Sequence, residues 1–304
     1  MIFYTGFADE AGSGLDAQIR ATCELGWNHI ESRNIDGINI HNLSDDKFEV
    51  AAAKLAAAGI KVNCFGSEIA NWGKDPFKEE DFQNSMAMLQ RALPRMKRLG
   101  TSMLRGMSFA MQKTRSPFDR EVEEQVFRKV GALVNVCAEA GIIYGHENCM
   151  NFGGQSWEHT LKLFDRIRSP YFKLIFDTGN PVFTDLRLGT PPYRKQSAWE
   201  FYCNIREFIY YVHIKDARFV AETDGIFPKA TFTWPGEGDG EVRRIVADLL
   251  HHGYDGGFSI EPHIASVFHE TDPARDLEKV KYDSYVEYGR RFMKIVDDAR
   301  SAIS

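Results

Sequence analysis

Residues 142–180, IIYGHENCMNFGGQSWEHTLKLFDRIRSPYFKLIFDTGN, contain one complete unit of the pattern that decides the fold. A short apolar strand predicted over Ile142–His146 is followed by a polar loop and by helical periodicity over Ser156–Ile167. A second apolar strand is predicted over Phe172–Phe176. An acidic residue follows each strand directly. The stretch therefore predicts a strand–helix–strand unit with a carboxylate at the carboxyl end of both strands.

The same alternation runs along the rest of the chain. The predicted strands are Phe3–Phe7, His29–Ser32, Ile60–Phe65, Ser102–Gly106, Ile142–His146, Phe172–Phe176, Tyr210–Ile214 and Gly257–Ile260. The predicted helices are Leu15–Leu25, Ser44–Ala58, Asp81–Leu99, Asp119–Ala140, Ser156–Ile167, Ala198–Phe208, Glu241–His252 and Asp276–Ala299. Ser44 is the expected N-cap of the second helix, and Gly59 is the glycine expected just beyond its end.

Strands that alternate with helices in this way predict an α/β fold, either a closed parallel barrel or a long doubly wound sheet. The G-x-G-x-x-G dinucleotide motif is absent after the first strand, and Asp9 and Glu10 there would repel a pyrophosphate. We therefore expect a single-domain (β/α)8 TIM barrel over residues 1–304. The least regular stretches, Thr178–Ser197 and Arg218–Gly240, follow late strands, and we expect them to build the mouth of the barrel.

Composition narrows the partners and the compartment. The formal net charge is -6 with no cluster of Lys and Arg, so a nucleic-acid partner is not expected. No apolar run approaches the roughly 18 residues of a membrane span. None of the five cysteines forms a C-x-x-C pair, and the first residues lack the basic start of a signal peptide. These features predict a reduced, cytoplasmic protein.

Four consecutive predicted strands each end on a residue that can bind a metal. The residues are Glu147, Asp177, His213 and Glu261. Neighbouring strand ends of a barrel meet at its carboxyl-terminal face, so these side chains should surround one point. Three carboxylates raise each other's pKa values when they crowd together, and a divalent cation removes that cost. One nitrogen and three carboxylates favour Mn²⁺ or Mg²⁺, with Co²⁺ and Zn²⁺ as alternatives.

Several motifs together resemble the xylose-isomerase-like barrel superfamily, in particular its sugar phosphate isomerase/epimerase group. They are the 142–180 stretch, GFADEAG near the start, CFGSEIANWGKDPF, VHIKDAR with WPGEGDGEV, and GYDGGFSIEP. The resemblance implies that Glu147 and Glu261 correspond to the paired carboxylates of ketose 3-epimerases. Those residues bind the metal and exchange a carbon-bound proton on opposite faces of the sugar. Asp177 and His213 correspond to the other two ligands.

The resemblance also implies substrate contacts. Asn180 stands where the epimerases often have a histidine, Arg218 is near the position of an arginine that contacts the same sugar oxygen, and Lys74 matches a lysine of the loop after strand three. Independently of the resemblance, Lys215 should share a face with His213, because strand side chains alternate.

Two further candidates have a structural reading as well as a functional one. Arg105 ends strand four as either a substrate ligand or an ion-pair partner, and His146 is either a core residue or a base. Trp72, Trp234 and Phe227 lie in predicted mouth loops, where they could cover a sugar ring or pack the loops.

These features predict a divalent-metal-dependent sugar isomerase or epimerase that transfers a proton through an enediolate. The main alternative is a lyase or dehydratase acting on a 3-keto sugar or glycoside, which would use nearly the same groups. A non-catalytic sugar-binding barrel is the second alternative. Endonuclease IV, a DNA enzyme of the same superfamily, fits poorly because it needs a three-zinc cluster and a basic groove. The aromatic last helix could mediate a homodimer or homotetramer, or could simply pack on the barrel.

Overall fold

The computed structural model describes residues 2–225, 227–264 and 276–303. Eight parallel strands pair side by side in the order β1-β12-β9-β8-β7-β6-β5-β2. Their bounds are β1 Phe3–Gly6, β2 His29–Ser32, β5 Lys61–Ile69, β6 Met103–Gly106, β7 Ile143–Glu147, β8 Phe172–Asp177, β9 Ile209–Ile214 and β12 Gly257–Ile260. The two outermost strands of this order, β1 and β2, are connected by a parallel bridge between Phe7 and Glu31. The predicted TIM barrel is therefore confirmed.

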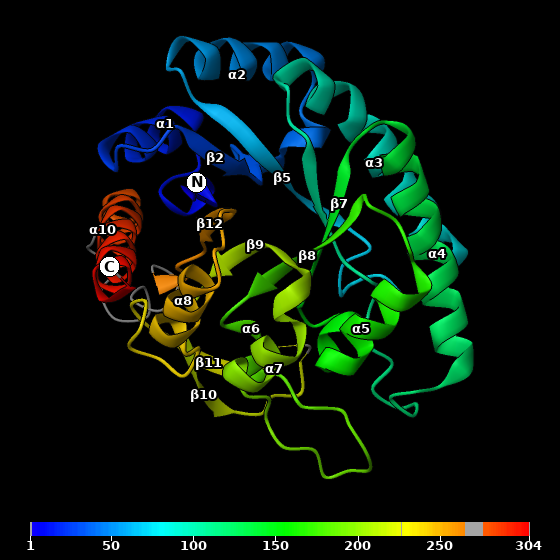
Figure 1. Cartoon of the computed structure of the whole chain (residues 1–304). Coiled ribbons are helices and arrows are strands. Elements are labelled where there is room, and N and C mark those ends of the chain that lie inside the picture. Colours follow the sequence, from blue (N-terminus) through cyan, green and yellow to red (C-terminus); the bar gives the residue numbers. More distant parts are fainter. Residues whose placement is uncertain (1, 226, 265–275, 304) are drawn as a thin grey trace.

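A ring of helices surrounds the strands (Figure 1). The helices are α1 Leu15–Glu24, α2 Asp45–Ala57, α3 Glu79–Leu99, α4 Arg120–Glu139, α5 Trp157–Arg166, α7 Ala198–Ile205, α8 Val242–His251 and α10 Leu277–Ile303. Ser44 caps α2 by accepting a hydrogen bond from the Lys47 backbone, and Gly59 after its end has φ +68°. Both residues were predicted in these positions.

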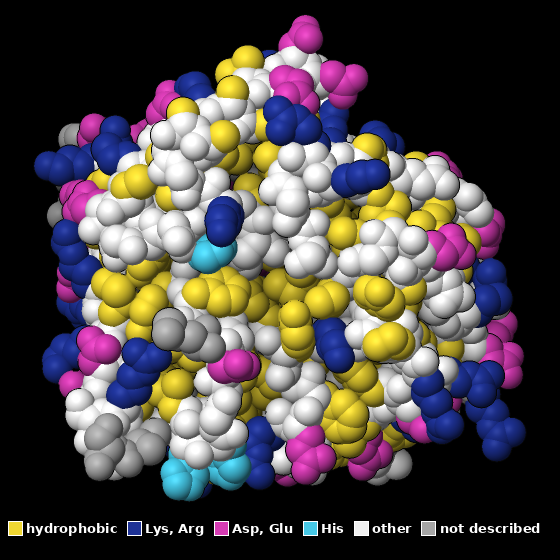
Figure 2. All heavy atoms as spheres, turned by 45° about the horizontal axis from the view of Figure 1, so that its top comes forward, with side chains coloured by type: hydrophobic (Ala, Val, Ile, Leu, Met, Phe, Trp, Pro, Cys, Tyr) yellow, Lys and Arg dark blue, Asp and Glu magenta, His cyan; other side chains and the backbone are white. Residues whose placement is uncertain are grey.

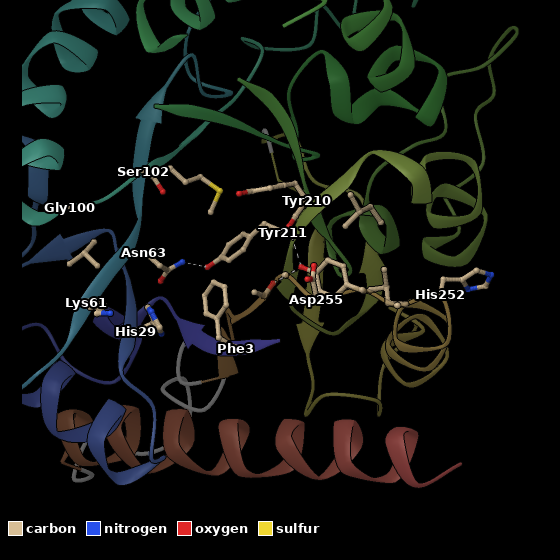
Figure 3. A pocket seen from close by; sticks show the side chains of 18 of the residues that line it. Phe3, His29, Lys61, Asn63, Gly100, Ser102, Tyr210, Tyr211, His252 and Asp255 are labelled. Atoms are coloured by element: carbon tan, nitrogen blue, oxygen red, sulfur yellow. Dashed lines mark hydrogen bonds between the residues drawn. The ribbon is translucent and has the colours of Figure 1, made fainter. Parts of the chain in front are cut away.

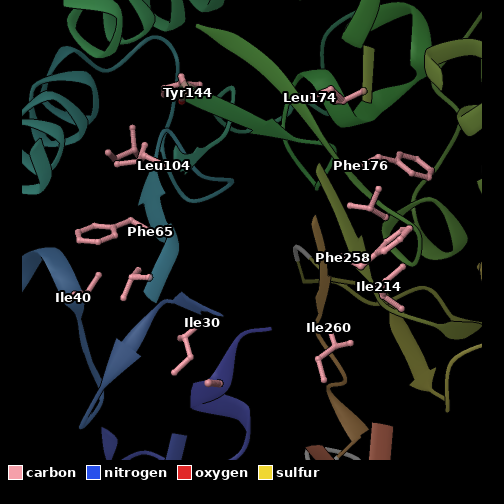
Figure 4. Packing of buried hydrophobic residues seen from close by; sticks show 14 of the residues in the cluster. Ile30, Ile40, Phe65, Leu104, Tyr144, Leu174, Phe176, Ile214, Phe258 and Ile260 are labelled. Carbon is pink, nitrogen blue, oxygen red and sulfur yellow. The ribbon is translucent and has the colours of Figure 1, made fainter. Parts of the chain in front are cut away.

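The strands alternate between two buried environments. Side chains that point outward from the barrel pack under the helices, and Figure 4 shows Phe65, Leu104, Leu174 and Phe258 among them. The inward side chains include a smaller apolar group formed by Cys64, Met103, Ile175 and Tyr211. Because both faces are covered, the strands read as short and nearly continuous apolar runs.

Close approach of neighbouring strands explains one glycine. A Cβ atom at Gly106 on β6 would lie 2.0 Å from Cζ of Tyr144 on β7. Tyr144 is fully buried, and its hydroxyl donates to the Met107 carbonyl at 2.7 Å. The tyrosine ring therefore occupies the space that any larger residue at position 106 would need.

The last helix uses its aromatic side against the barrel. Tyr285, Tyr288 and Phe292 of α10 are at most 1% exposed. Phe292 packs edge to face against Tyr4, with the two ring centroids 6.1 Å apart. Trp27 donates its indole hydrogen to the Met293 sulfur at 3.2 Å. Packing within the chain therefore accounts for the aromatic residues that raised the prediction of an oligomer interface.

The loops at the carboxyl ends of the strands contain short elements of their own. The stretch 218–240 was expected to be irregular, but it contains an antiparallel hairpin of β10 Ala217–Ala221 and β11 Lys229–Phe232. The expectation failed because alternation over so few residues is a weak signal. A one-turn helix, α6 Asn180–Phe183, follows β8, and the hairpin β3 Asn34–Ile35 with β4 Ile38–Asn39 follows β2.

The surface is mixed in character. Figure 2 shows hydrophobic side chains across the middle of one face, with Lys, Arg, Asp and Glu concentrated toward its borders. Among the residues that the structure describes, no helix has both the length and the apolar character needed to cross a bilayer.

Candidate metal centre

The four predicted ligands meet at one point. Glu147, Asp177, His213 and Glu261 each offer a ligand atom, and these atoms all lie within 4.8 Å of one another. All four side chains are at most 4% exposed. Acidic groups without a nearby cation are normally solvated, so the burial of three of them together requires positive charge nearby.

The barrel brings these residues together by register. Glu147 ends β7, Asp177 ends β8 and pairs with His213 on β9, and Glu261 directly follows β12. β12, β9, β8 and β7 are consecutive in the sheet, and the four side chains point inward. These four strands are also consecutive barrel strands along the chain, so pairing of neighbouring parallel strands places their carboxyl ends side by side.

Charged side chains hold the two glutamates in place. Glu147 accepts from Arg105 through Oε2 at 3.2 Å and from the Asn180 side chain through Oε1 at 3.2 Å. Glu261 accepts from Lys215 through Oε2 at 2.8 Å, and Arg33 lies 3.3 Å from its Oε1. Each glutamate is therefore held by a cation from a neighbouring strand: Glu147 by Arg105 of β6, and Glu261 by Lys215 just after β9.

Asp177 has one satisfied and one poorly satisfied oxygen. Its Oδ1 accepts from the backbone nitrogens of Gly179 and Asn180 at 2.8 and 2.7 Å. Its buried Oδ2 accepts no hydrogen bond of acceptable geometry, although the Lys215 ammonium lies 2.9 Å away. A carboxylate oxygen left this way is suited to a metal ion.

The pKa values of the four candidate ligands reflect the excess of carboxylates over cations in the cluster. Burial raises the pKa of Asp177 to about 6, against the opposing influence of Lys215. Burial also opposes ionisation of Glu147, but Arg105 and His213 outweigh it and lower its pKa to about 2. Burial would keep His213 neutral, yet Glu31 and Glu147 raise its pKa to about 10. The nearby carboxylates thus favour the protonated, positively charged form of His213. A metal ion bound in the cluster would supply positive charge in place of that proton.

The donor set fits a divalent ion. Three carboxylates and one imidazole within 4.8 Å are the ligand types that Mn²⁺, Mg²⁺ or Zn²⁺ binds. Asp177 Oδ2, which pairs with the Lys215 ammonium but accepts no hydrogen bond, could contribute an electron pair to the ion. All five cysteines are free thiols, and none belongs to this cluster.

Two of the four candidate ligands, Glu147 and Glu261, lie on the floor of a cavity of about 860 Å³ at the carboxyl ends of the strands, whereas Asp177 and His213 do not line it. Its polar floor is lined by Glu147, Glu261, Asn180, Lys215, Arg105 and Arg33. Its walls include apolar side chains from several mouth loops, among them Trp72, Met107, Phe227 and Phe232. Trp72 and Phe227 meet edge to face, with ring centroids 5.4 Å apart. The cavity thus combines a charged floor with an apolar mouth, a combination that suits a small organic ligand.

The predicted substrate contacts divide into two groups. Asn180, Lys215 and Arg105 line the cavity beside the candidate ligands. Arg218 is exposed and donates to the Glu237 carbonyl, and the Lys74 ammonium donates to the Glu68 carbonyl of its own loop. Neither lines the cavity, because the loops that contain them turn these side chains toward their own backbones.

His146, for which the sequence allowed either a core position or a role as a base, does not line the cavity. As the neighbour of Glu147 on β7 it points to the opposite face, where its Nε2 lies 2.9 Å from Ser108 Oγ. Burial lowers its pKa to about 4. It is therefore a neutral core histidine. Trp234, the third aromatic residue predicted in the mouth loops, instead packs against Arg291 at 4.2 Å.

Four charged residues at the site were missed in the sequence. Arg33 contacts Glu261, and His263 lies 2.9 Å from Glu10 through Nδ1 and 3.4 Å from Glu261 through Nε2. Glu31 on β2 lies behind His213, at 3.0 Å from its Nε2. The signal for Glu31 was present, since it is an acidic residue at an inward position of a strand, but β2 lies outside the four consecutive strands whose ends carry the predicted ligands.

The glycine-rich segment WPGEGDG binds an internal carboxylate. Asp216 accepts four backbone hydrogen bonds, from Ala217, Gly236, Gly238 and Gly240, at 2.8–3.0 Å. A Cβ atom at Gly238 would lie 2.3 Å from the carboxylate. The amides of this loop are therefore already used and do not form a phosphate site.

Comparisons with known proteins agree with this geometry. Residues 19–281 match the family model described as xylose isomerase-like TIM barrel. A curated inosose dehydratase of Bacillus velezensis is 25% identical over 183 residues, which are 57% of this chain and 56% of the relative. The match thus spans only about half of that enzyme.

Two solved structures share the fold at low sequence identity. The crystal structure of the IOLI protein with a bound zinc atom has a TM-score of 0.71 and 13% identity over 97% of this chain and 98% of that one. A D-tagatose 3-epimerase-like protein has a TM-score of 0.66 and 16% identity over 97% of this chain and 98% of that one.

Proposed function

The chain belongs to the xylose isomerase-like TIM barrel family, and from this premise we propose that it is a divalent-metal-dependent isomerase or epimerase of a sugar. The supporting observation is the position of Glu147 and Glu261. They project from β7 and β12, with β8 and β9 between them, and both line the floor of the cavity. A substrate on this floor would have one carboxylate on either side.

Glu147, Asp177, His213 and Glu261 would hold the ion. A divalent ion here would polarise a substrate carbonyl and thereby acidify the neighbouring C–H bond. We propose Mn²⁺ as the preferred ion because three carboxylates make an oxygen-rich site, with Mg²⁺, Co²⁺ or Zn²⁺ as substitutes.

The protein side chains would then move the proton. The pKa values of Glu147 and Glu261 lie below the ordinary value despite burial, because Arg105 acts on the first and Lys215 on the second. Both residues are therefore carboxylates at neutral pH and able to accept a proton from carbon. One glutamate would remove the proton and the other would return one, to the opposite face for epimerisation or to the adjacent carbon for isomerisation.

Asn180, Arg105 and Lys215 would position the substrate. The Asn180 amide already binds Glu147, and Lys215 already binds Glu261, so substrate oxygens would compete for or share these donors. The apolar mouth would exclude water from the reacting carbon. A free sugar fits this site better than a phosphate ester, since the amides of the glycine-rich segment WPGEGDG are occupied by Asp216.

The experiment measures solvent deuterium uptake into a panel of keto-sugars, by NMR, with the Mn²⁺-loaded enzyme. Glu147→Gln and Glu261→Gln should each lower the exchange rate by about 10²–10⁴-fold, the usual contribution of a general base. Glu158→Gln, which alters an exposed glutamate of α5, should leave the rate unchanged. Metal content is measured in parallel, because both variants also change a ligand.

Absence of exchange by the metal-loaded wild-type protein on every sugar of the panel would favour a non-catalytic sugar-binding barrel. Exchange accompanied by loss of water from the sugar, seen by mass spectrometry, would favour the second candidate, a dehydratase or lyase. That candidate is supported by the partial match to inosose dehydratase. Both activities begin with removal of the same kind of proton, so the product distinguishes them.

A further inference from the structure

Glu31 is a buried carboxylate beneath the metal cluster. It lies on β2, its side chain is fully enclosed, and it does not line the substrate cavity. Its Oε2 is within hydrogen-bond distance of three groups: Ser259 Oγ at 2.7 Å, Tyr211 OH at 2.9 Å and His213 Nε2 at 3.0 Å. Its other oxygen, Oε1, has no hydrogen-bond partner. Burying a carboxylate is costly, so the three contacts of Oε2 offset that cost and point to a specific task.

The contact with His213 determines how that ring is used. An ionised carboxylate can only accept hydrogen bonds, so His213 Nε2 must carry a hydrogen toward Glu31. The other ring nitrogen, Nδ1, faces the cluster and lies 3.4 Å from Glu147 Oε1. In the neutral imidazole, Nδ1 is then the nitrogen with a free electron pair.

We propose that Glu31 is a positioning residue that holds His213 in the Nε2–H form and directs its Nδ1 atom at the metal. This inference rests on the proposed function, since it presumes that a metal binds here. A carboxylate behind a metal-binding histidine fixes the ring orientation and makes the imidazole a stronger ligand. Glu31 thereby contributes to the centre from a strand that supplies none of its four ligands.

A series of hydrogen-bonded polar side chains also holds the Glu31 carboxylate. Tyr211 OH donates to Glu31 and accepts from Asn63 Nδ2 at 2.9 Å, and Asn63 Oδ1 accepts from Thr5 at 2.8 Å. Figure 3 shows the contact between Asn63 and Tyr211 at a second cavity, of about 840 Å³. This cavity borders the amino-terminal ends of the strands. The series connects Glu31 to that end of the barrel, so the carboxylate cannot turn away from His213 without breaking several hydrogen bonds.

Tyr211 offers a matched control. Tyr211→Phe removes one donor from the same Glu31 oxygen but leaves the His213 contact intact. Glu31→Gln keeps the size of the side chain while it removes the charge and introduces a donor. If Glu31 acts through His213, the glutamine variant should weaken metal binding much more than the phenylalanine variant.

The first measurement is titration of the metal-free proteins with Mn²⁺, followed by calorimetry, with circular dichroism as the check on folding. Glu31→Gln should weaken Mn²⁺ binding by about 10–100-fold, the usual effect of losing such a partner. Tyr211→Phe should stay within a few-fold of the wild type. Wild-type affinity in folded Glu31→Gln, or an equal loss in Tyr211→Phe, would overturn the inference and leave the proposed function standing.

The second measurement needs no variant. ¹⁵N NMR of the histidine rings in the Zn²⁺-loaded wild-type protein should show His213 with a protonated Nε2 and a metal-bound Nδ1. Zinc on Nε2 would overturn the inference even though a metal is bound. Failure of the wild-type protein to bind either Mn²⁺ or Zn²⁺ would overturn the proposed function and this inference together.

Discussion

Replacement of Asp216 by asparagine tests how the loop beside the site is held. Asp216 is fully enclosed, and its Oδ1 accepts from Ala217 and Gly240 while its Oδ2 accepts from Gly236 and Gly238. An asparagine has one oxygen and one NH₂ group. Whichever way the amide turns, two backbone donors face the NH₂ group and lose their acceptor.

The expected cost follows from these two donors. A buried donor without an acceptor costs about 1–3 kcal/mol, so Asp216→Asn should lower the free energy of unfolding by roughly 2–6 kcal/mol. Folded domains are stable by only about 5–15 kcal/mol, so the loss is readily measured. Gly238 and Gly240 approach the carboxylate so closely that a Cβ atom at either position would clash with it.

The assay is equilibrium urea unfolding, followed by tryptophan fluorescence and circular dichroism. Asp239→Asn is the control, because Asp239 is exposed on the same loop and its replacement should change stability by less than about 0.5 kcal/mol. If the two variants have the same unfolding midpoint, the loop is not held by the Asp216 carboxylate and the reasoning is wrong.

Three further predictions concern acid stability, metal binding and packing. Burial lowers the pKa values of His41 and His159 to about 4, below the value of about 6.5 in the unfolded chain. Both residues therefore contribute folding stability above pH 6.5, and this stability is lost as the pH falls toward 4. At pH 5 each histidine should lower the free energy of unfolding by about 2 kcal/mol relative to its value above pH 6.5. The urea midpoint of a His159→Gln variant should therefore depend less on pH than that of the wild type. Addition of Mn²⁺ at one hundred times its dissociation constant should stabilise the fold by about 2.7 kcal/mol. The expected readout is a rise in melting temperature that EDTA reverses, and an unchanged melting temperature would contradict the metal site. Gly106→Ala should reduce stability by about 3 kcal/mol or more because of the clash with Tyr144, whereas Gly131→Ala, with no neighbouring atom within 4 Å, should be neutral or stabilising in thermal melts.

Much of the candidate site could be predicted from the sequence because it follows strand periodicity. Each barrel strand is short and apolar, and a metal-type ligand at its carboxyl end stands out against that background. The same periodicity places Lys215 beside His213, and it also puts His146 on the face opposite Glu147. The strand pattern alone therefore favours the core position of His146 over a role as a base.

Loop residues were predicted less well for a physical reason. Lys74 and Arg218 are long side chains on irregular segments, and each binds a nearby backbone carbonyl. Which way such a side chain turns depends on the path of its loop, and no short-range pattern records that path.

The sequence alone determined the alternation of strands and helices, and it determined which strand ends carry ligands, because both depend on spacing along one chain. Only the tertiary structure decided that Glu31, Arg33 and His263 belong to the same site. Glu31 on β2 and Arg33 just after it reach the cluster through closure of the barrel, which brings β2 and β1 around to β12. His263 follows β12 closely along the chain, and the path of its loop turns it toward Glu261 and Glu10. The distance between two side chains on different strands is set by barrel register, and register emerges only when all eight strands pair.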